Sequence, residues 1–443
     1  MGLAYTSVDH GLDGVDTTNK LQMMSGQTAG SRVGMRGYEE LGDGNKVGFI
    51  LETGMNMDTG ALGQEGRLFG RQAVLYVDGP YGNFKMGQQG SLMSGFPDSG
   101  LFGGNMSPFA VGLGEVAGHR FIYSTEDALP MDNSFTYITP KFSGWQVMLQ
   151  YSAGMNTVRY GGQDFESSVD RYAAAGLHFD NKTTEFNFVV DWSNYRSAGA
   201  NAYEDDPDDG VRAAFGVRHG VSFGNLYAGA QYFKEARHFL QEANQFYGRS
   251  DVAKSMLFLT NDEFGKDGYG INLGIDYFAL GGTIKGQMGY MKAEKSDDSS
   301  MELKRWFVSA GYWYDFSKHT TLYTGVSYLQ DSLGGKDYAQ YDVASCIAWA
   351  SCTTSNASAR LLRLQARQLQ RALRQPPKED PASGFGGFFD AFFCRFFSPV
   401  RGRPKAKKTV RLCSEARPDC LTNTAVALKE QGSGRERKRP IPA

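Results

Sequence analysis

Apolar and polar residues alternate with a period of two over most of the chain, in segments of about 8–12 residues. In the segment 211–223, Val211 and Phe215 share one face, and Arg212 and Arg218 share the other. Alternation of this kind is typical of strands with one apolar and one polar face. The same split recurs in Gly144–Ser152, Thr184–Asn194, Asn225–Lys234, Tyr269–Leu280, Gly282–Lys292, Arg305–Phe316 and Thr320–Asp331.

The connections between these segments are of two kinds. About 14 alternating segments lie between Ser31 and Asp331. The stretches 80–82 and 180–183 are short and rich in turn residues, which predicts tight turns. The long connections, which we expect to be loops, are Gly90–Met131, Tyr195–Gly210, Glu235–Asp267 and Ala293–Met301. The pattern therefore predicts an antiparallel sheet with short turns at one end and long loops at the other.

The length of the strands favours a transmembrane barrel over a soluble sheet protein. A strand of about 10 residues tilted near 45° crosses a bilayer, and aromatic residues such as Trp145, Trp192 and Trp306 stand near strand ends, as in interface girdles. In hydrocarbon only a closed sheet pairs every backbone group, and about 16 strands would enclose a water-filled lumen. A soluble all-β protein is the alternative that this pattern leaves open. A helical membrane protein is excluded, because no run approaches the ~18–20 apolar residues of a spanning helix.

Charge and cysteine divide the 443 residues into a body and a tail. Residues 1–342 carry 27 basic and 41 acidic side chains, whereas residues 343–443 carry 19 basic and 7 acidic ones. All five cysteines lie in the tail, and all 23 tyrosines lie in the body. We therefore predict two units, a β-barrel over 1–342 and a basic tail containing Cys and Pro over 343–443, which we expect to be disordered or translated out of frame.

Catalytic and metal-binding motifs are not found in the sequence. There is no His-Glu-x-x-His zinc motif, phosphate-binding loop or Gly-x-Ser-x-Gly nucleophile elbow. The acidic run Glu204–Asp209 lacks the spacing of an EF-hand and is expected to be a solvated external loop, with a Ca²⁺ site as the alternative. We expect no enzymatic activity, no cofactor, no metal and no nucleic-acid partner, although the basic tail could attract nucleic acid electrostatically.

Five stretches of the body carry a more specific pattern: Ser31–Gly42, Lys46–Gly54, Asp58–Ala73, Tyr81–Gln89 and Asp132–Trp145. Together they resemble the general diffusion porins of Gram-negative outer membranes, a family of trimeric barrels with about 16 strands, and the likeness continues to about Tyr341. The resemblance implies a homotrimer in the cell outer membrane, in contact with lipid and lipopolysaccharide. It implies a water-filled channel for passive diffusion of ions and small hydrophilic solutes. A surface adhesin or receptor without significant conductance, and a non-functional fragment, are the alternatives.

In that family the third loop folds into the barrel and narrows it, and Gly90–Met131 has this place here. The resemblance implies that acidic loop residues face basic wall residues, which creates a transverse field favouring small polar solutes. A wall arginine often found in the sixth strand of the family is Thr136 here, and Arg120 could substitute for it. The residues expected at the constriction are Arg32, Arg36, Arg71, Lys85, Asp98, Glu115 and Arg120.

The two ends of the body depart from the family pattern. The first strand is reduced to Gly2–Thr6, and the alternation that should complete the last strand is replaced at about Val343 by tail sequence. No signal peptide is present in this sequence. Because the first and last strands form the barrel seam, we expect unpaired edges there, and a chain that as written does not form a conducting pore.

Overall fold

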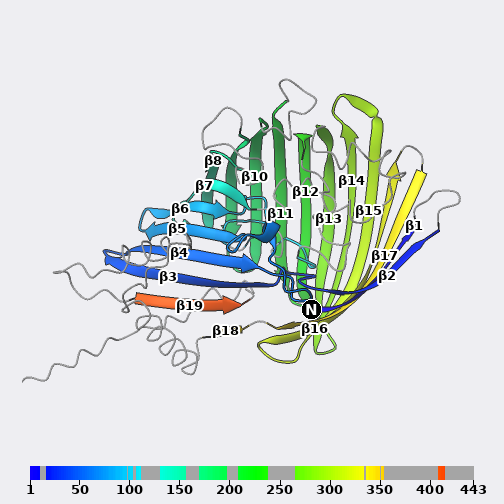
Figure 1. The fold of residues 1–443 in the computed structure, drawn as a ribbon, viewed down its shortest axis with the longest axis horizontal. Helices are drawn as coiled ribbons and strands as arrows, with labels where there is room; N and C mark the ends of the chain where they lie inside the picture. Colours follow the sequence, from blue (N-terminus) through cyan, green and yellow to red (C-terminus); the bar gives the residue numbers. More distant parts are fainter. Residues whose placement is uncertain are drawn as a thin grey trace, which may run out of the picture.

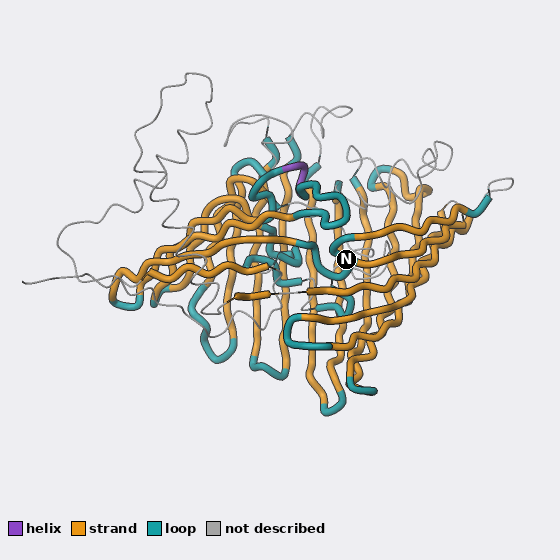
Figure 2. Tube along the Cα trace, turned by 60° about the horizontal axis from the view of Figure 1, so that its bottom comes forward, coloured by secondary structure: helices purple, strands orange, loops and turns teal. Residues whose placement is uncertain are grey.

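The computed structural model describes residues 1–9, 16–96, 98–102, 106–110, 130–155, 169–196, 208–237, 265–333, 336–349, 351–353 and 408–414. In these ranges the regular segments are strands, apart from the single 3-10 turn η1 (Gln64–Gly66), which is purple in Figure 2. No helix of the described residues is long and apolar enough to cross a membrane.

The strands are β1 (Gly2–Asp9), β2 (Thr18–Met24), β3 (Arg32–Gly42), β4 (Asn45–Gly54), β5 (Gln72–Gly79), β6 (Gly82–Gln89), β7 (Met131–Ile138), β8 (Trp145–Ser152), β9 (Arg171–Asp180), β10 (Thr184–Asn194), β11 (Gly210–Val221), β12 (Gly224–Ala236), β13 (Lys266–Ala279), β14 (Gly282–Lys295), β15 (Asp298–Asp315), β16 (Thr320–Leu333), β17 (Lys336–Trp349), β18 (Ser351–Thr353) and β19 (Lys408–Ser414).

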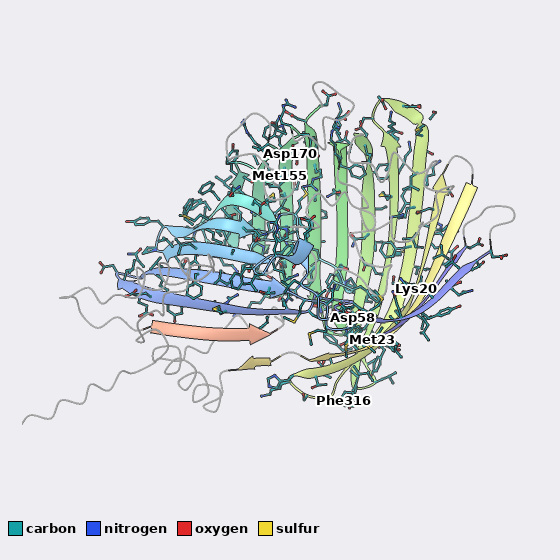
Figure 3. The ribbon with its side chains drawn as sticks, in the orientation of Figure 1. Lys20, Met23, Asp58, Met155, Asp170 and Phe316 are labelled. Atoms are coloured by element: carbon teal, nitrogen blue, oxygen red, sulfur yellow. The ribbon has the colours of Figure 1, made fainter. Side chains whose placement is uncertain are left out.

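Consecutive strands from β3 to β17 pair with one another, always antiparallel, and form one curved sheet (Figure 1). The strands β3 to β16 correspond to the 14 alternating segments between Ser31 and Asp331, so that prediction is confirmed. The short turns and the long connections also lie at opposite ends of the strands. Phe316, in the turn between β15 and β16, lies at the opposite end from Met155 and Asp170 (Figure 3).

The sheet exposes its apolar face and buries its polar face, the reverse of a soluble protein. On β13, Tyr269, Leu273 and Tyr277 are exposed, whereas Asn272 and Asp276 between them are buried. A protein folded in water would bury the apolar set, so the outward apolar face is the one that meets hydrocarbon. The predicted all-β transmembrane barrel is therefore the fold class of this chain, with a polar inner face.

Aromatic side chains mark the upper and lower borders of the outward apolar face. Near the short turns, the Trp145 ring lies 4.7 Å from that of Phe179, between ring centroids. Toward the other end, the Trp306 ring lies 5.0 Å from that of Tyr328. On β13, Tyr269 and Tyr277 are eight residues apart, which is about 20–27 Å depending on strand tilt and close to the apolar band of a membrane barrel.

The connection Ala293–Met301, which the sequence predicted to be a long loop, is instead mostly strand. β14 continues to Lys295 and β15 begins at Asp298, so only two residues connect them. At this end of the two strands the outward residues Lys292, Glu294 and Glu302 are charged instead of apolar, so the apolar–polar alternation that identifies a strand is lost there. An ion pair connects the two strands there, with Nζ of Lys292 2.9 Å from Oε2 of Glu302.

The prediction of unpaired edges between the first and last strands is wrong. β1 pairs with β17 along its whole length, from Gly2 opposite Cys346 to Asp9 opposite Ala339. β17 crosses the predicted boundary between body and tail, and Val343 to Ser345 continue the alternation as exposed, buried and exposed residues. The seam therefore draws strand residues from the tail sequence.

β2 was not predicted from the sequence, and it, not β3, is the second neighbour of β1. It pairs with the second edge of β1, from Gly2 opposite Met24 to Val8 opposite Thr18. The outer edge of β3 pairs instead with β19, which lies beside it in Figure 1. The strands β1 and β3–β17 number sixteen, as the porin resemblance implies, and β2 stands beside β1 in the place that β3 would take in a closed ring.

Candidate functional site

The segment that follows β6 lies on the inner face of the sheet. Leu92 and Phe102 are buried in a hydrophobic cluster together with Met148 of β8, Val189 of β10 and Ala214 of β11. These three wall residues stand on the inward side of their strands. The third loop therefore starts at β6 and passes inside the wall across β8 to β11.

Hydrogen bonds from buried amides fix the start of this path. Gln150 of β8 donates from Nε2 to the carbonyl of Gly90 at 3.0 Å and accepts from the backbone N–H of Leu92 at 2.9 Å. Asn187 of β10 donates from Nδ2 to the carbonyl of Leu101. Polar side chains of the wall thus satisfy backbone groups of the loop, whose described residues up to Ala110 form turns and bends.

Two glycines of the wall leave the space that this segment occupies. A Cβ at Gly176 of β9 would lie 3.1 Å from a side-chain carbon of Leu101. A Cβ at Gly216 of β11 would lie 2.8 Å from the sulfur of Met106. The Gly-rich inner faces that the sequence shows are here a means of close approach between loop and wall.

Asp98, on the loop, lies against two basic residues of the wall. Its carboxylate Oδ2 lies 3.0 Å from Nη2 of Arg36 on β3, and its carbonyl oxygen accepts a hydrogen bond from Nζ of Lys85 on β6. The pairing joins residues 62 positions apart in the chain. The structure therefore brings together three of the seven residues that the sequence proposed.

A second basic pair lies next to this contact. Arg71 donates from Nε to Oε1 of Glu52 on β4 at 2.6 Å, and Nη1 of Arg32 lies 4.0 Å from the same oxygen. The guanidinium of Arg71 also stands 4.7 Å from the ring centroid of Phe96 on the loop. We call Arg32, Glu52, Arg36, Arg71, Lys85 and Asp98 the charged cluster.

Glu52 is the member of the charged cluster that sequence reasoning missed. Its signal was available, because it shares the inward face of its strand with Lys46 and Gly48. The family resemblance points to the basic residues of the wall, and Glu52 is not among them. With Glu52 included, the charged cluster holds four cationic side chains and two carboxylates, so it is net positive while every carboxylate has a basic neighbour.

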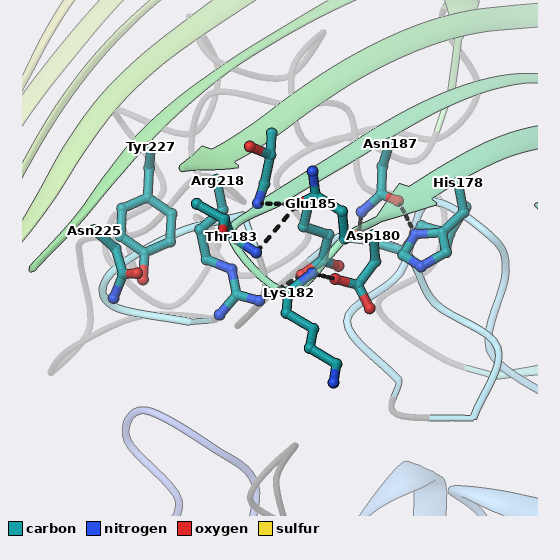
Figure 4. Close-up of polar contacts among 12 residues, drawn as sticks. His178, Asp180, Lys182, Thr183, Glu185, Asn187, Arg218, Asn225 and Tyr227 are labelled. Carbon is teal, nitrogen blue, oxygen red and sulfur yellow. Dashed lines mark hydrogen bonds and ion pairs between the residues drawn. The ribbon is translucent and has the colours of Figure 1, made fainter. Parts of the chain in front are cut away.

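Further ion pairs line the inner wall away from this cluster. Arg212 of β11 and Asp191 of β10 form a bidentate pair, and Tyr172 donates to the same carboxylate at 2.7 Å. Arg305 of β15 pairs in the same way with Asp331 of β16. A third pair, Arg218 with Glu185 at 2.8 Å, lies close to the turn at Lys182 and Thr183 (Figure 4).

Two of the proposed constriction residues, Glu115 and Arg120, lie outside the described residues, as does most of the acidic run Glu204–Asp209. Thr136, which stands where the family often has arginine, is buried and accepts a hydrogen bond from Gln150. Over the parts of the chain that the structure describes, no group of three or more His, Cys, Asp or Glu side chains could hold a metal ion.

The chain is similar to known proteins of one family. A family model described as Gram-negative porin matches residues 3–333. An outer membrane porin protein of Bordetella pertussis is 27% identical over 354 residues, which cover 74% of this chain and 86% of the relative. Outer membrane porin protein 32 of Delftia acidovorans is 24% identical over 308 residues, covering 68% and 74%. Among solved structures, the anion-selective porin from Comamonas acidovorans aligns with a TM-score of 0.49 at 18% identity, covering 78% of this chain and 97% of that one.

Proposed function

Because this chain belongs to the Gram-negative porin family, and porins are passive-diffusion channels of the cell outer membrane, we propose that its pore is narrowest between Asp98 and the basic wall. The third loop and the wall meet there through the contacts of Asp98 with Arg36 and Lys85. This meeting of loop and wall is the observation that carries the proposal. The family implies a channel that works without catalysis.

The charged cluster would act on solutes through its field. Arg36 of β3 and Lys85 of β6 face Asp98 on the loop, so a solute that passes between wall and loop crosses a transverse field. Such a field favours ions and small hydrophilic solutes, whose charges or dipoles it can orient, over apolar ones. Glu115 and Arg120 belong to this proposal as further loop charges.

The net positive charge of the cluster supports a modest preference for anions. The body as a whole is acidic, but at physiological salt the screening length is about 8 Å, so charge at the narrowest point outweighs distant loop charge. The reversal potential across a planar bilayer in a KCl gradient measures this preference. A cation-selective value would contradict it.

The channel itself is tested by single-channel recording of the purified full chain. Steady conductance steps are expected. A chain that inserts into the bilayer without steps would instead favour the adhesin alternative or a non-conducting product, and would remove the basis for the constriction.

We also propose that three copies associate through the outer face of β3–β6. This wall is low, since β5 and β6 have 8 residues each whereas β13–β16 have 14–18. Its outward residues include the exposed Met35, Val77 and Phe84, which suit contact with another barrel. The taller walls would face lipid, with Lys292 and Lys304 above the aromatic border, at the level of lipopolysaccharide head groups. Chemical cross-linking in detergent should yield a trimer.

A further inference from the structure

Phe109, near the far end of the described loop, is buried in an aromatic pocket of the opposite wall. Its ring meets Trp313 of β15 edge-on, with centroids 5.3 Å apart. Trp313 in turn stacks on Tyr323 of β16 at 5.3 Å, with 5° between the ring planes. Ala4 of β1 and Ala344 of β17 belong to the same buried cluster. We call these four wall residues the aromatic dock.

Polar contacts hold the chain on the N-terminal side of Phe109. Ser107 donates from Oγ to Oε1 of Gln287 on β14 at 2.8 Å. Lys285 donates from Nζ to the carbonyl of Pro108 at 2.9 Å, while Asp276 lies 3.2 Å from the same ammonium group. Three successive loop residues are thus each in contact with the wall.

The wall has no side chain where Pro108 lies. A Cβ on Gly274 of β13 would stand 2.6 Å from two ring carbons of Pro108, which is closer than real Cβ contacts. Loop and wall are therefore complementary in shape at this point. The fit also gives a way to disturb the dock from the wall side.

The two ends of the described loop are far apart around the sheet. Asp98 is held on β3 and β6, whereas Phe109 is held on β15 and β16, nine strands along from β6 to β15. A segment held at both places lies along the inner side of the sheet, and it cannot move toward one of them without leaving the other.

We propose that Phe109 is the positioning residue that holds the third loop in place inside the lumen, and that its seat in the aromatic dock sets the open area of the pore and hence the largest solute that passes. The charged cluster acts on charge, and the dock acts on size. This inference rests on the proposed channel function, and it assigns to Phe109 a role in selecting solutes by size.

The test uses four variants of the full chain in planar bilayers and in liposomes. Phe109→Ala empties the dock, and Phe109→Leu keeps an apolar anchor. Gly274→Ala displaces Pro108 from the wall side. The matched control is Gly220→Ala on β11, where an added Cβ finds its nearest atom at an ordinary 3.4 Å. The readouts are single-channel conductance and the ratio of liposome swelling rates in a large and a small sugar.

Phe109→Ala and Gly274→Ala are both expected to raise the conductance by about 1.5- to 2-fold, or to make it fluctuate between levels, and to raise the swelling ratio for the large sugar. Phe109→Leu and Gly220→Ala should stay near the unmodified protein. Equal conductance and equal swelling ratios for Phe109→Ala and Gly220→Ala would overturn the dock as the determinant of pore area. Absence of conductance in the unmodified chain would instead overturn the proposed function.

A general loss of stability would not produce this pattern. A poorly folded variant inserts less often, which lowers the number of channels but leaves the conductance of each channel unchanged. A Phe109→Ala variant that showed only fewer channels, with unchanged unit conductance and sugar ratio, would therefore count against the inference.

Discussion

Asp98 contacts the wall in two chemically different ways. Its carboxylate accepts from Arg36, and its backbone carbonyl accepts from Lys85. Only the first contact depends on the side-chain charge, so charge and loop position can be separated by substitution. Arg71, by contrast, combines an ion pair with Glu52 and a ring contact with Phe96, and its removal would change both.

Asp98→Asn should raise the anion-to-cation permeability ratio by roughly twofold at low salt, because it removes one of the two carboxylates of the charged cluster and keeps the carbonyl contact. The measurement is the reversal potential in a KCl gradient. The control is Glu302→Gln, which removes a charge on the strand extension above the aromatic border. An unchanged or lower ratio for Asp98→Asn would show that the narrowest charged point lies elsewhere.

Two ion pairs between β10 and β11 differ in how deeply they are buried, and burial decides how much each pair contributes to stability. The side chains of Arg212 and Asp191 are 2% and 1% exposed. In the pair on the same two strands near the turn, the Arg218 side chain is 36% exposed. A buried arginine that loses its carboxylate cannot be hydrated, whereas an exposed one can.

Asp191→Ala should therefore destabilise the barrel by about 3–5 kcal/mol, whereas Glu185→Ala should cost about 1 kcal/mol or less. Urea unfolding of the two variants in detergent micelles, followed by tryptophan fluorescence, compares them with the unmodified protein. Equal midpoints for the two variants would mean that water reaches Arg212 as freely as Arg218.

On the lipid-facing side of β13, the cost of a charged residue should depend on its depth in the membrane. Leu273 lies midway between the border residues Tyr269 and Tyr277, and all three are exposed. Leu273→Arg should cost about 2–4 kcal/mol in a bilayer and Tyr277→Arg about 0–1 kcal/mol, because the penalty for a charge falls from the midplane to the interface. Unfolding from liposomes measures both. Equal costs would place Leu273 away from the hydrocarbon.

The seam between β1 and β17 joins the two ends of the barrel sequence, and closure of the barrel depends on it. Residues 343–346 of β17 pair with Gly2–Tyr5 of β1, so half of the β1 ladder depends on sequence beyond residue 342. The division into a barrel over 1–342 and a separate tail stays a prediction, and the ladder suggests where to test it.

A chain ending at Thr353 should assemble and conduct, whereas a chain ending at Asp342 should lose most of its folded yield, because the latter leaves Gly2–Tyr5 without β17. Both truncations remove β19, so their difference reports the loss of residues 343–353, which pair with Gly2–Tyr5 of β1 and also with Thr320–Val326 of β16. Folded yield is read from heat-dependent migration on SDS gels and from channel insertions. Equal yields from the two chains would mean that the β17 extension is dispensable.

Local alternation determined much of this protein. It gave the positions of β3 to β16, the outward set that includes Leu273 and the inward set that includes Arg36, because the direction of a side chain in a strand follows from its place in the chain. The motifs added the family and hence the channel. Alternation failed where the outward residues are charged, as at Ala293–Met301, and it did not predict that the last strand, β17, continues into the tail sequence.

Tertiary structure alone decided which groups meet across long stretches of chain. The contact of Asp98 with Arg36, the sharing of Glu52 between Arg71 and Arg32, the seat of Phe109 in the aromatic dock and the pairing of β2 with β1 have no local signature. Each depends on the curvature of the whole sheet, which brings β6 and β15 to face one lumen. The physical reason is that alternation is set residue by residue, whereas a loop or an edge selects its partner only among surfaces that the folded sheet has already formed.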